Sequence, residues 1–268
     1  MKKMSLILAL IMVFSCFAFT ACSKQEATND KEATKFIVGF DADFPPYGYQ
    51  EDGEYKGFDL DLAKEVCKRN GWEFVAQPID WDSKDHELNA GTISCLWNGF
   101  TINGREDDYT WSDPYVDNTQ VMVVKKDSGI TKLSDLAGKT VSVQAASSAE
   151  SVLKDEEGQK KLADTFKELI AEREYNTCFA NLEAGAVDAV AMDIGVAKYQ
   201  IESRGADKYV MLEEDLSTEK YGVGFKKGNT ELRDQVQKTL DEMMEDGTFQ
   251  KIAKDWGLTD SVIIKEAK

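Results

Sequence analysis

LNAGTISCLWN at residues 88–98 and LEAGAVDAVAM at residues 182–192 are two short stretches with nearly the same pattern. In each, the end of a helix is followed by a glycine that stops it and then by a run of residues typical of a buried strand. The leucine and the glycine of the first stretch recur 94 positions later in the second. The chain is therefore predicted to contain the same helix–strand unit twice. The match is too short to indicate duplication, because any two βαβ units share it.

Helical and extended patterns alternate around both stretches. Up to residue 126 we expect a strand at 35–40, a helix at 58–70, a strand at 73–79, a helix at 83–91, a strand at 92–98 and an extended run at 119–126. The pattern then restarts with a strand at 139–145, a helix from 147, a strand at 166–172, a helix at 176–185, a strand at 186–193, a helix at 194–205, extended segments at 208–215 and 220–228, and helices at 229–247 and 248–257, the first with Thr230 as its N-cap. Such alternation indicates βαβ units with mainly parallel sheets, and two cycles of it predict two α/β lobes.

Charged side chains of opposite sign follow strands in the two predicted lobes. Ligands of parallel α/β sheets gather outside the carboxyl ends of the strands. Arg105 is one of five arginines, and its planar fork suits a carboxylate, whereas Asp193 offers a negative acceptor to a cation. Together they describe a receptor for a free α-amino acid. Two simpler alternatives remain open: an ion pair of Arg105 with Glu106 or Asp107, and an N-cap role for Asp193.

Other groups at these strand ends suit the same ligand. Thr101 adds a hydroxyl and Gly99 an approachable carbonyl, while Phe44 and Trp81 offer flat apolar walls. The segment AASSAE at 145–150 lies at a predicted helix start, where we expect free backbone N–H groups that favour an anion.

The net charge of the chain limits the classes of binding partner. The formal charge is −17, and it becomes −19 when the first 21 residues, with two lysines and no acidic residue, are left out. Such a charge argues against nucleic acid and anionic lipid surfaces as direct partners.

The N-terminus has the pattern of a secretion signal. A short basic region is followed by an apolar run from Ser5 to Phe19 and by a small residue before Cys22, and this run is short for a membrane span. The segment resembles the bacterial lipoprotein box, which implies a signal peptide at 1–21 and lipidation at Cys22. Plain secretory cleavage is the alternative, and 13–16 is a weaker competing box. Residues 22–34 are polar, without apolar periodicity, and are predicted to be a disordered tether.

Cysteine and histidine usage predicts neither a metal nor a cofactor. Cys67, Cys95 and Cys178 lack metal-ligand spacing, and His86 is the only histidine. Cys67 and Cys95 are expected to pack in the core.

Several motifs carry a resemblance to bacterial solute-binding proteins family 3, which serve polar amino-acid ABC transporters. The resemblance covers 35–257 and rests on GFDLDLAKEVCKRN (57–70), DADFPPYGY (41–49), NGFTI (98–102), WSDPY (111–115), DLAGKTVSV (135–143), AGAVDAVAMD (184–193) and YGVGF (221–225). It implies the type II periplasmic-binding-protein fold, with two α/β lobes joined by two crossing strands. Lobe 1 would comprise 35–118 and 220–262, lobe 2 would comprise 119–219, and the hinges would lie near 117–120 and 216–221.

The resemblance also assigns roles to the strand ends. It implies that Arg105, with backbone N–H groups of Thr101 and Ser147, holds a ligand carboxylate. It implies that Asp193, the Gly99 carbonyl and the Thr101 hydroxyl hold the ammonium. The ligand-binding residues expected on this basis are Asp41, Phe44, Trp81, Asn98, Gly99, Thr101, Arg105, Gln144, Ser147, Ser148 and Asp193. Phe44 and Trp81 would enclose the ligand side chain, and Asp41 would contact its polar end.

The sequence departs from the family at three points. Thr101 and Arg105 are four positions apart, where relatives usually have five. Cys67 matches a position that is disulfide-bonded in some relatives, but the partner position holds Phe74, so we predict a free thiol. Gln144 and Met192 occupy ligand-facing positions that vary with specificity.

The resemblance implies a binding protein rather than an enzyme. We expect an extracytoplasmic monomer, anchored to the cell membrane by lipid (including palmitate) on Cys22. It would capture a basic, amide or cystine-like amino acid and deliver it to an ABC permease. The alternatives are a cyclic-acid dehydratase of the same fold, with Glu150 or Asp41 as the acid, and a ligand-sensing surface lipoprotein.

Overall fold

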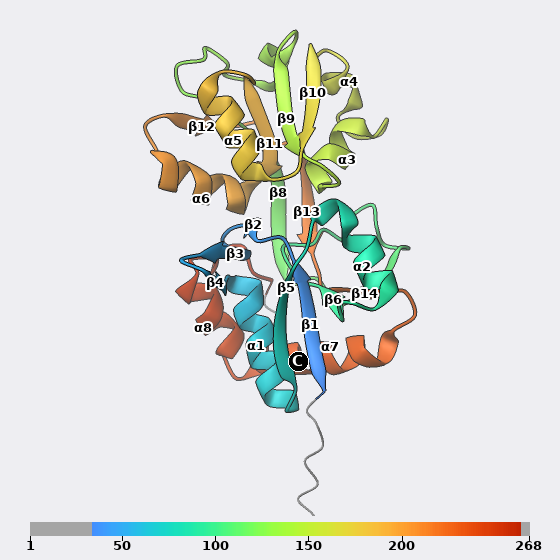
Figure 1. Cartoon of the computed structure of the whole chain (residues 1–268). Coiled ribbons are helices and arrows are strands. Elements are labelled where there is room, and N and C mark those ends of the chain that lie inside the picture. Colours follow the sequence, from blue (N-terminus) through green and yellow to red (C-terminus); the bar gives the residue numbers. More distant parts are fainter. Residues whose placement is uncertain (1–33, 264–268) are drawn as a thin grey trace, which may run out of the picture. The chain divides into compact units, whose positions relative to one another are not determined.

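The computed structural model of the chain describes residues 34–263. The predicted signal peptide, lipidation site and nearly all of the predicted tether therefore lie outside the described residues. The described chain forms two α/β lobes (Figure 1), which confirms the predicted fold class. No helix in this part of the chain is long and apolar enough to cross a membrane.

Lobe 1 is built around a five-stranded mixed sheet with the order β5-β1-β6-β14-β7. Its strands are β1 (Lys35–Phe40), β5 (Glu73–Pro78), β6 (Cys95–Leu96), β7 (Tyr109–Trp111) and β14 (Gly224–Lys226). The strands β5, β1 and β6 are parallel, and β14 is antiparallel to both of its neighbours. The carboxyl ends of the parallel strands therefore lie at one edge of the sheet.

Helices cover both faces of this sheet. They are α1 (Phe58–Asn70), η1 (Trp81–Ser83), α2 (Lys84–Ala90), α7 (Thr230–Glu245) and α8 (Thr248–Asp255). Successive side chains of a strand point to opposite faces. Thus Phe36, Val38 and Phe40 of β1 pack in the core formed with α1, whereas Ile37 packs in the cluster that includes Leu88 of α2.

A small antiparallel sheet follows β1, and the sequence analysis did not predict it. Its strands are β2 (Asp43–Phe44), β3 (Gly48–Glu51) and β4 (Glu54–Lys56). This sheet carries the segment after the carboxyl end of β1 back towards α1.

Lobe 2 contains a six-stranded sheet with the order β10-β9-β11-β8-β12, in which β13 also pairs with β8. Its strands are β8 (Val116–Lys125), β9 (Thr140–Gln144), β10 (Glu168–Glu172), β11 (Ala189–Asp193), β12 (Tyr209–Met211) and β13 (Ser217–Tyr221). Its helices are η2 (Leu133–Leu136), α3 (Ser148–Lys154), α4 (Lys160–Ala163), α5 (Tyr175–Ala184) and α6 (Ile194–Arg204). The strands β10, β9 and β11 are parallel, and the pairs with β8 are antiparallel.

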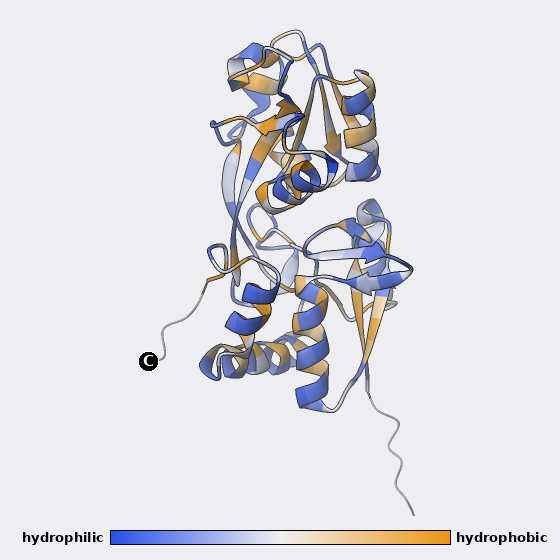
Figure 2. Cartoon of the chain, turned by 90° about the vertical axis from the view of Figure 1, so that its left-hand side faces the viewer, coloured by the Kyte–Doolittle hydropathy of each residue, from blue (hydrophilic) through white to orange (hydrophobic). Residues whose placement is uncertain are grey.

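The central strands of lobe 2, which are β9, β11 and the part of β8 at 121–124, are buried on both faces. On β8, Val121 and Val123 pack towards α5 and α6, whereas Met122 and Val124 pack towards α3. Figure 2 shows apolar residues concentrated on the central strands of both lobes, with polar residues on the outer helix surfaces. A continuous apolar run, as in β8 and β11, is the pattern expected for a strand covered on both sides.

Two strands connect the lobes. The strands β8 and β13 lie side by side between them (Figure 1) and pair antiparallel from Ser217 with Gln120 to Tyr221 with Val116. An isolated bridge between Thr101 and Tyr221 continues this pairing into lobe 1. The connection therefore passes directly beside the strand ends that were predicted to hold a ligand.

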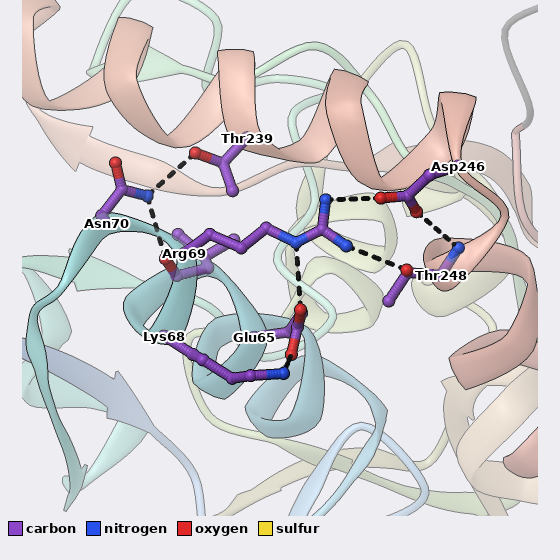
Figure 3. Close-up of polar contacts among 8 residues, drawn as sticks. Glu65, Lys68, Arg69, Asn70, Thr239, Asp246 and Thr248 are labelled. Atoms are coloured by element: carbon purple, nitrogen blue, oxygen red, sulfur yellow. Dashed lines mark hydrogen bonds and ion pairs between the residues drawn. The ribbon is translucent and has the colours of Figure 1, made fainter.

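A polar cluster ties the C-terminal helices to α1. Arg69 donates from Nη1 to Asp246 Oδ2 at 2.7 Å, from Nη2 to Thr248 Oγ1 at 2.9 Å and from Nε to Glu65 Oε1 at 3.0 Å (Figure 3). The arginine beside Asp246 holds the pKa of that carboxyl well below its usual range. The return of the chain to lobe 1 after β13 is thus fixed at the junction of α7 and α8.

Two details of the fold differ from the sequence-based expectations, and a third confirms one of them. The strand predicted at 92–98 is limited to Cys95–Leu96, because only these two residues continue the ladder with β1 before the chain turns at Gly99. The predicted N-cap Thr230 is wrong: Asn229 has the non-helical backbone, and its side chain accepts from Leu232 N. Cys67 has a free thiol, as predicted.

Candidate functional site

A small cavity lies between the lobes and is lined by residues from both. Its volume is about 20 Å³, which is room for roughly one water molecule. The lining residues are Phe44, Trp81, Asn98, Gly99, Phe100, Thr101, Arg105, Gln144, Ser147, Ser148 and Asp193. The structure thus brings together all the predicted ligand-binding residues except Asp41, and it adds Phe100.

Asp41 lies next to this cavity and lines a larger one of about 630 Å³. Its Oδ2 accepts from Gln144 Nε2 of lobe 2 at 2.6 Å, and its Oδ1 accepts from Asp43 N at 2.9 Å. Its own N–H donates to Asn98 Oδ1 at 2.8 Å. Burial raises the pKa of Asp41 to about 6, and the bond from Gln144 opposes this rise. The Asp41–Gln144 bond therefore separates the two cavities and joins the two lobes.

Arg105 is held at the edge of the cavity by backbone carbonyls rather than by the adjacent acidic residues. Its Nη1 donates to Thr101 O at 3.2 Å and its Nη2 to Ala146 O of lobe 2 at 3.4 Å. The guanidinium carbon lies 5.4 Å from the ring centre of Phe100. These contacts are long or shared, so a carboxylate that entered the cavity would be a stronger acceptor for the same guanidinium.

The backbone N–H group of Thr101 also points to the side of the strand on which the cavity lies. On either side of the bridge between Thr101 and Tyr221, Gly222 N donates to Phe100 O and Ile102 N donates to Lys220 O. The N–H and C=O of Thr101 therefore face away from β13, on the side where Arg105 contacts its carbonyl. A carboxylate bound to Arg105 would lie within reach of this N–H.

Gly99 owes its position to a buried carboxylate that the sequence analysis did not single out. Its N–H donates to Asp59 Oδ2 at 2.6 Å, and Tyr115 OH donates to Asp59 Oδ1 at 2.9 Å. Burial raises the pKa of Asp59 to about 7. Gly99 has φ +56°, and a Cβ there would lie 2.7 Å from the Phe44 ring. Asp59 stands in the motif at 57–70, but its contact with Gly99 is 40 positions away and needs the folded chain.

The helix start at 145–150 differs from the expectation. Ala146 N donates to Glu150 Oε2 at 2.7 Å, Glu150 N donates to Ser147 Oγ at 3.1 Å, and Ser147 N donates to Gln144 O at 3.3 Å. The expectation of free N–H groups is therefore wrong for these three residues, because the helix caps itself.

Two aromatic side chains form the predicted walls. Trp81 packs edge-on against Phe100, with ring centres 5.3 Å apart. Phe44 packs against Tyr175 of lobe 2 at 6.0 Å and against Tyr47 at 5.9 Å. Both walls are buried and belong to hydrophobic core clusters.

Asp193 is the acidic group of lobe 2 in the cavity. It precedes α6, but its side chain does not cap that helix. Its Oδ1 accepts from Tyr221 OH at 2.6 Å, from Gln120 Nε2 at 2.7 Å and from Asn118 Nδ2 at 2.8 Å. All three bonds end on Oδ1, so Oδ2 is the oxygen that can accept from a group placed in the cavity.

Glu219 of β13 is a second buried carboxylate at this end of the site. Its Oε1 accepts from Thr101 Oγ1, Asn118 Nδ2 and Gln120 Nε2, each at 2.8 Å, and its Oε2 accepts from Ser148 Oγ. Because the Thr101 hydroxyl donates to Glu219, its oxygen can only accept from a ligand. The sequence analysis did not identify Glu219, because it lies in the polar segment 217–220 and belongs to none of the recognised motifs.

The two carboxylates repel each other inside the protein. Burial and then the nearby Glu219 raise the pKa of Asp193 to about 7, although three hydrogen bonds stabilise its ionised form. A cation bound at Asp193 would relieve this cost. The cavity is thus lined by a guanidinium from lobe 1 and by a buried acidic group without a cationic partner from lobe 2.

Comparison with known proteins agrees with this arrangement. Residues 36–259 match the family model of bacterial extracellular solute-binding proteins, family 3. The chain belongs to this family, and its fold is that of the type II periplasmic binding proteins.

Three relatives illustrate the similarity. The chain is 32% identical to the arginine-binding extracellular protein ArtP of Bacillus subtilis, covering 92% of this chain and 96% of ArtP. It is 29% identical to the L-cystine-binding protein TcyJ of Escherichia coli, covering 84% of each. A solved ABC uptake transporter substrate-binding protein from Streptococcus pneumoniae with bound histidine is 35% identical, with a TM-score of 0.80, covering 85% of this chain and 94% of that one. All three are binding proteins, which supports the prediction that the chain is not an enzyme.

Proposed function

We propose that the chain binds a polar α-amino acid between its lobes and delivers it to the membrane permease of an ABC importer. The observation that carries this proposal is the opposition of Arg105 from lobe 1 and Asp193 from lobe 2 across one cavity. Arg105 would hold the carboxylate together with the Thr101 N–H. Asp193 Oδ2, the Thr101 hydroxyl oxygen and the Gly99 carbonyl would hold the ammonium.

The mechanism follows from the two-strand connection. A cavity of about 20 Å³ is too small for an amino acid, so a ligand enters when the lobes are further apart. We place the hinges at 117–120 and 216–221, within the paired strands β8 and β13. Closure then brings Asp193 towards a ligand already held by Arg105, and the ligand favours the closed state because only that state offers both contacts.

The end of the site near Asp41 supports a ligand with a basic or cystine-like side chain. Asp41, Asp43, Asp80, Glu87 and Glu174 line the neighbouring cavity, together with the single cation Arg173. A side chain that displaced Gln144 from Asp41 would reach this acidic space. The relatives that bind arginine, cystine and histidine agree with this class.

The cellular setting is proposed from the N-terminal sequence and from the family. Cleavage after residue 21 and lipidation of Cys22 would anchor a monomer to the outside of the cell membrane. Residues 22–34 would serve as a tether that lets the closed form reach its permease. Labelling of the expressed protein with a radioactive fatty acid, and loss of that label in Cys22→Ala, would test the anchor.

Titration calorimetry of Arg105→Ala tests the binding site. Loss of a partly buried cation from a carboxylate typically costs about 2–5 kcal/mol, so amino-acid affinity should fall at least about 30-fold while the thermal unfolding curve keeps its shape. Arg233→Ala is the matched control, because Arg233 lies at the start of α7 and contacts Trp111 O instead of the cavity. Wild-type affinity in Arg105→Ala would exclude the proposed site.

A further inference from the structure

Lys84 of α2 is a buried cation for which the proposed function has no role. It is 4% exposed, and its Nζ donates to two backbone carbonyls, Trp81 O at 3.4 Å and Ala146 O at 3.3 Å. The ammonium lies 5.4 Å from the Trp81 ring centre. It forms no ion pair within residues 34–263. A buried lysine without an ion-pair partner is costly. Burial, then the nearby Arg105, lower its pKa to about 8, although the more distant carboxylates Asp85, Asp82 and Glu150 oppose this shift.

Lys84 and Arg105 converge on the same oxygen atom. The carbonyl oxygen of Ala146 accepts from Lys84 Nζ at 3.3 Å and from Arg105 Nη2 at 3.4 Å. Both cations belong to lobe 1, whereas Ala146 belongs to lobe 2. When the lobes move apart, the shared oxygen leaves, and lobe 1 presents two cations aimed at one point.

Ala146 has an unusual backbone conformation at this contact. Ala146 has φ +56°, in the left-handed region that non-glycine residues rarely adopt. This turn sits between β9 and the N-cap Ser147 and directs the Ala146 carbonyl across the cleft to Lys84 and Arg105. A neutral carbonyl is a weak partner for two cations, and both bonds are long.

We propose that Lys84 is a second cation of the carboxylate subsite, so that the ligand carboxylate bridges Lys84 and Arg105 in place of the Ala146 carbonyl. This inference rests on the proposed function and deepens it. Two positive charges at one end make a free, ionised carboxylate a requirement. The site therefore selects free amino acids over amino-acid amides, esters and peptides extended at the carboxyl end.

The test compares free amino acids with their amides. Wild-type protein and Lys84→Met, which keeps the apolar stem, are titrated with L-arginine and L-argininamide and with L-histidine and L-histidinamide. We expect Lys84→Met to bind the free acid about 10- to 100-fold more weakly and the amide within about 2-fold of wild type. The ratio of the affinity for the free acid to the affinity for the amide should therefore fall by about the same factor as the affinity for the free acid. Lys198→Met, an exposed lysine of α6, is the matched control.

Each other outcome has a definite meaning. Equal losses for acid and amide, or no loss for either, would overturn the role of Lys84. If Lys84→Met does not fold, Lys84→Gln keeps a donor to Ala146 O without the charge and should show the same loss of preference; an unchanged preference in that variant would refute the inference. If the wild type binds an amino acid other than arginine or histidine, that amino acid and its amide are the pair compared. Failure of the wild type to bind any of the twenty amino acids, cystine or ornithine would instead overturn the proposed ligand class, and this inference with it.

Discussion

Replacement of Asp193 by asparagine should have opposite effects on two quantities: the stability of the free protein and its affinity for an amino acid. In the folded protein the pKa of Asp193 is about 7, raised by burial and by Glu219; in an unfolded chain it is about 3.9. Because the folded pKa is the higher one, the contribution of Asp193 to stability is complete below about pH 4 and is lost as the pH rises through 7. Asp193→Asn cannot ionise, so it escapes this loss.

The size of the effect follows from linkage. Between pH 5 and pH 8 the ionisation of a group with a folded pKa near 7 removes about 3 kcal/mol of stability. The unfolding free energy of Asp193→Asn relative to wild type should therefore rise by about 3 kcal/mol over this range. For a chain of this size that corresponds to about 6–12 °C in the difference between the two Tm values.

The assay is thermal unfolding of both proteins at pH 5 and pH 8, with calorimetric titration of an amino acid at pH 8. Asp193→Asn should gain relative stability at pH 8 and lose about 100-fold or more in affinity, because the ammonium then loses its contact with an anionic oxygen. Asp207→Asn, an exposed carboxylate of lobe 2, should change neither quantity.

A Tm difference between Asp193→Asn and wild type that is the same at both pH values would refute the reasoning. It would mean that Asp193 ionises at a normal pKa and is not strained by burial beside Glu219. Unchanged affinity at pH 8 would mean that Asp193 does not contact the ligand.

Two further predictions concern the same region and the fold. Glu219→Gln removes the negative charge beside Asp193 and should lower the pKa of Asp193 from about 7. Because ionised Asp193 holds the ammonium, affinity measured by calorimetry should rise with pH and level off at a lower pH in this variant than in wild type. An unchanged dependence of affinity on pH would contradict this prediction. Gly57→Ala should destabilise the protein by about 3 kcal/mol or more in denaturant unfolding, because Gly57 has φ +146° and a Cβ would lie 2.1 Å from Tyr47 O. Gly53→Ala, at φ +82° with open space around it, should cost only about 1–2 kcal/mol, and equal costs for the two variants would refute the steric argument.

Local structure could be predicted well where a single physical signal dominates. The helix at 58–70 was predicted with its observed bounds, since its apolar stripe is flanked by glycines at 57 and 71. The strand β11 was recognised because an apolar run follows a glycine stop, and β9 was recognised although Val141 and Val143 alternate with polar residues. The gathering of strand ends followed from the rule for parallel sheets. The full set of expected site residues was implied by the family resemblance, and all of them except Asp41 line one cavity.

Contacts between segments far apart in the sequence could not be predicted in this way. Glu219 reaches Thr101 and Ser148, which lie 118 and 71 positions away, only because β13 pairs with β8 between the lobes. The sequence analysis did not single out Lys84, because its contact with the Ala146 carbonyl of lobe 2 joins residues 62 positions apart. The N–H groups expected to be free before and at the start of α3 have local acceptors instead: Glu150 Oε2 for Ala146, Ser147 Oγ for Glu150 and Gln144 O for Ser147.

The most direct test of the central claim is thermal unfolding of the purified protein, freed of bound ligand by unfolding and refolding, against the twenty amino acids, cystine and ornithine. A ligand at about 100 times its Kd adds about 2.7 kcal/mol, or about 5–10 °C in Tm for a chain of this size. The account predicts such a shift for one or a few polar amino acids, with basic amino acids and cystine first among them. The absence of a shift with every compound would contradict the assignment of the cavity as an amino-acid site.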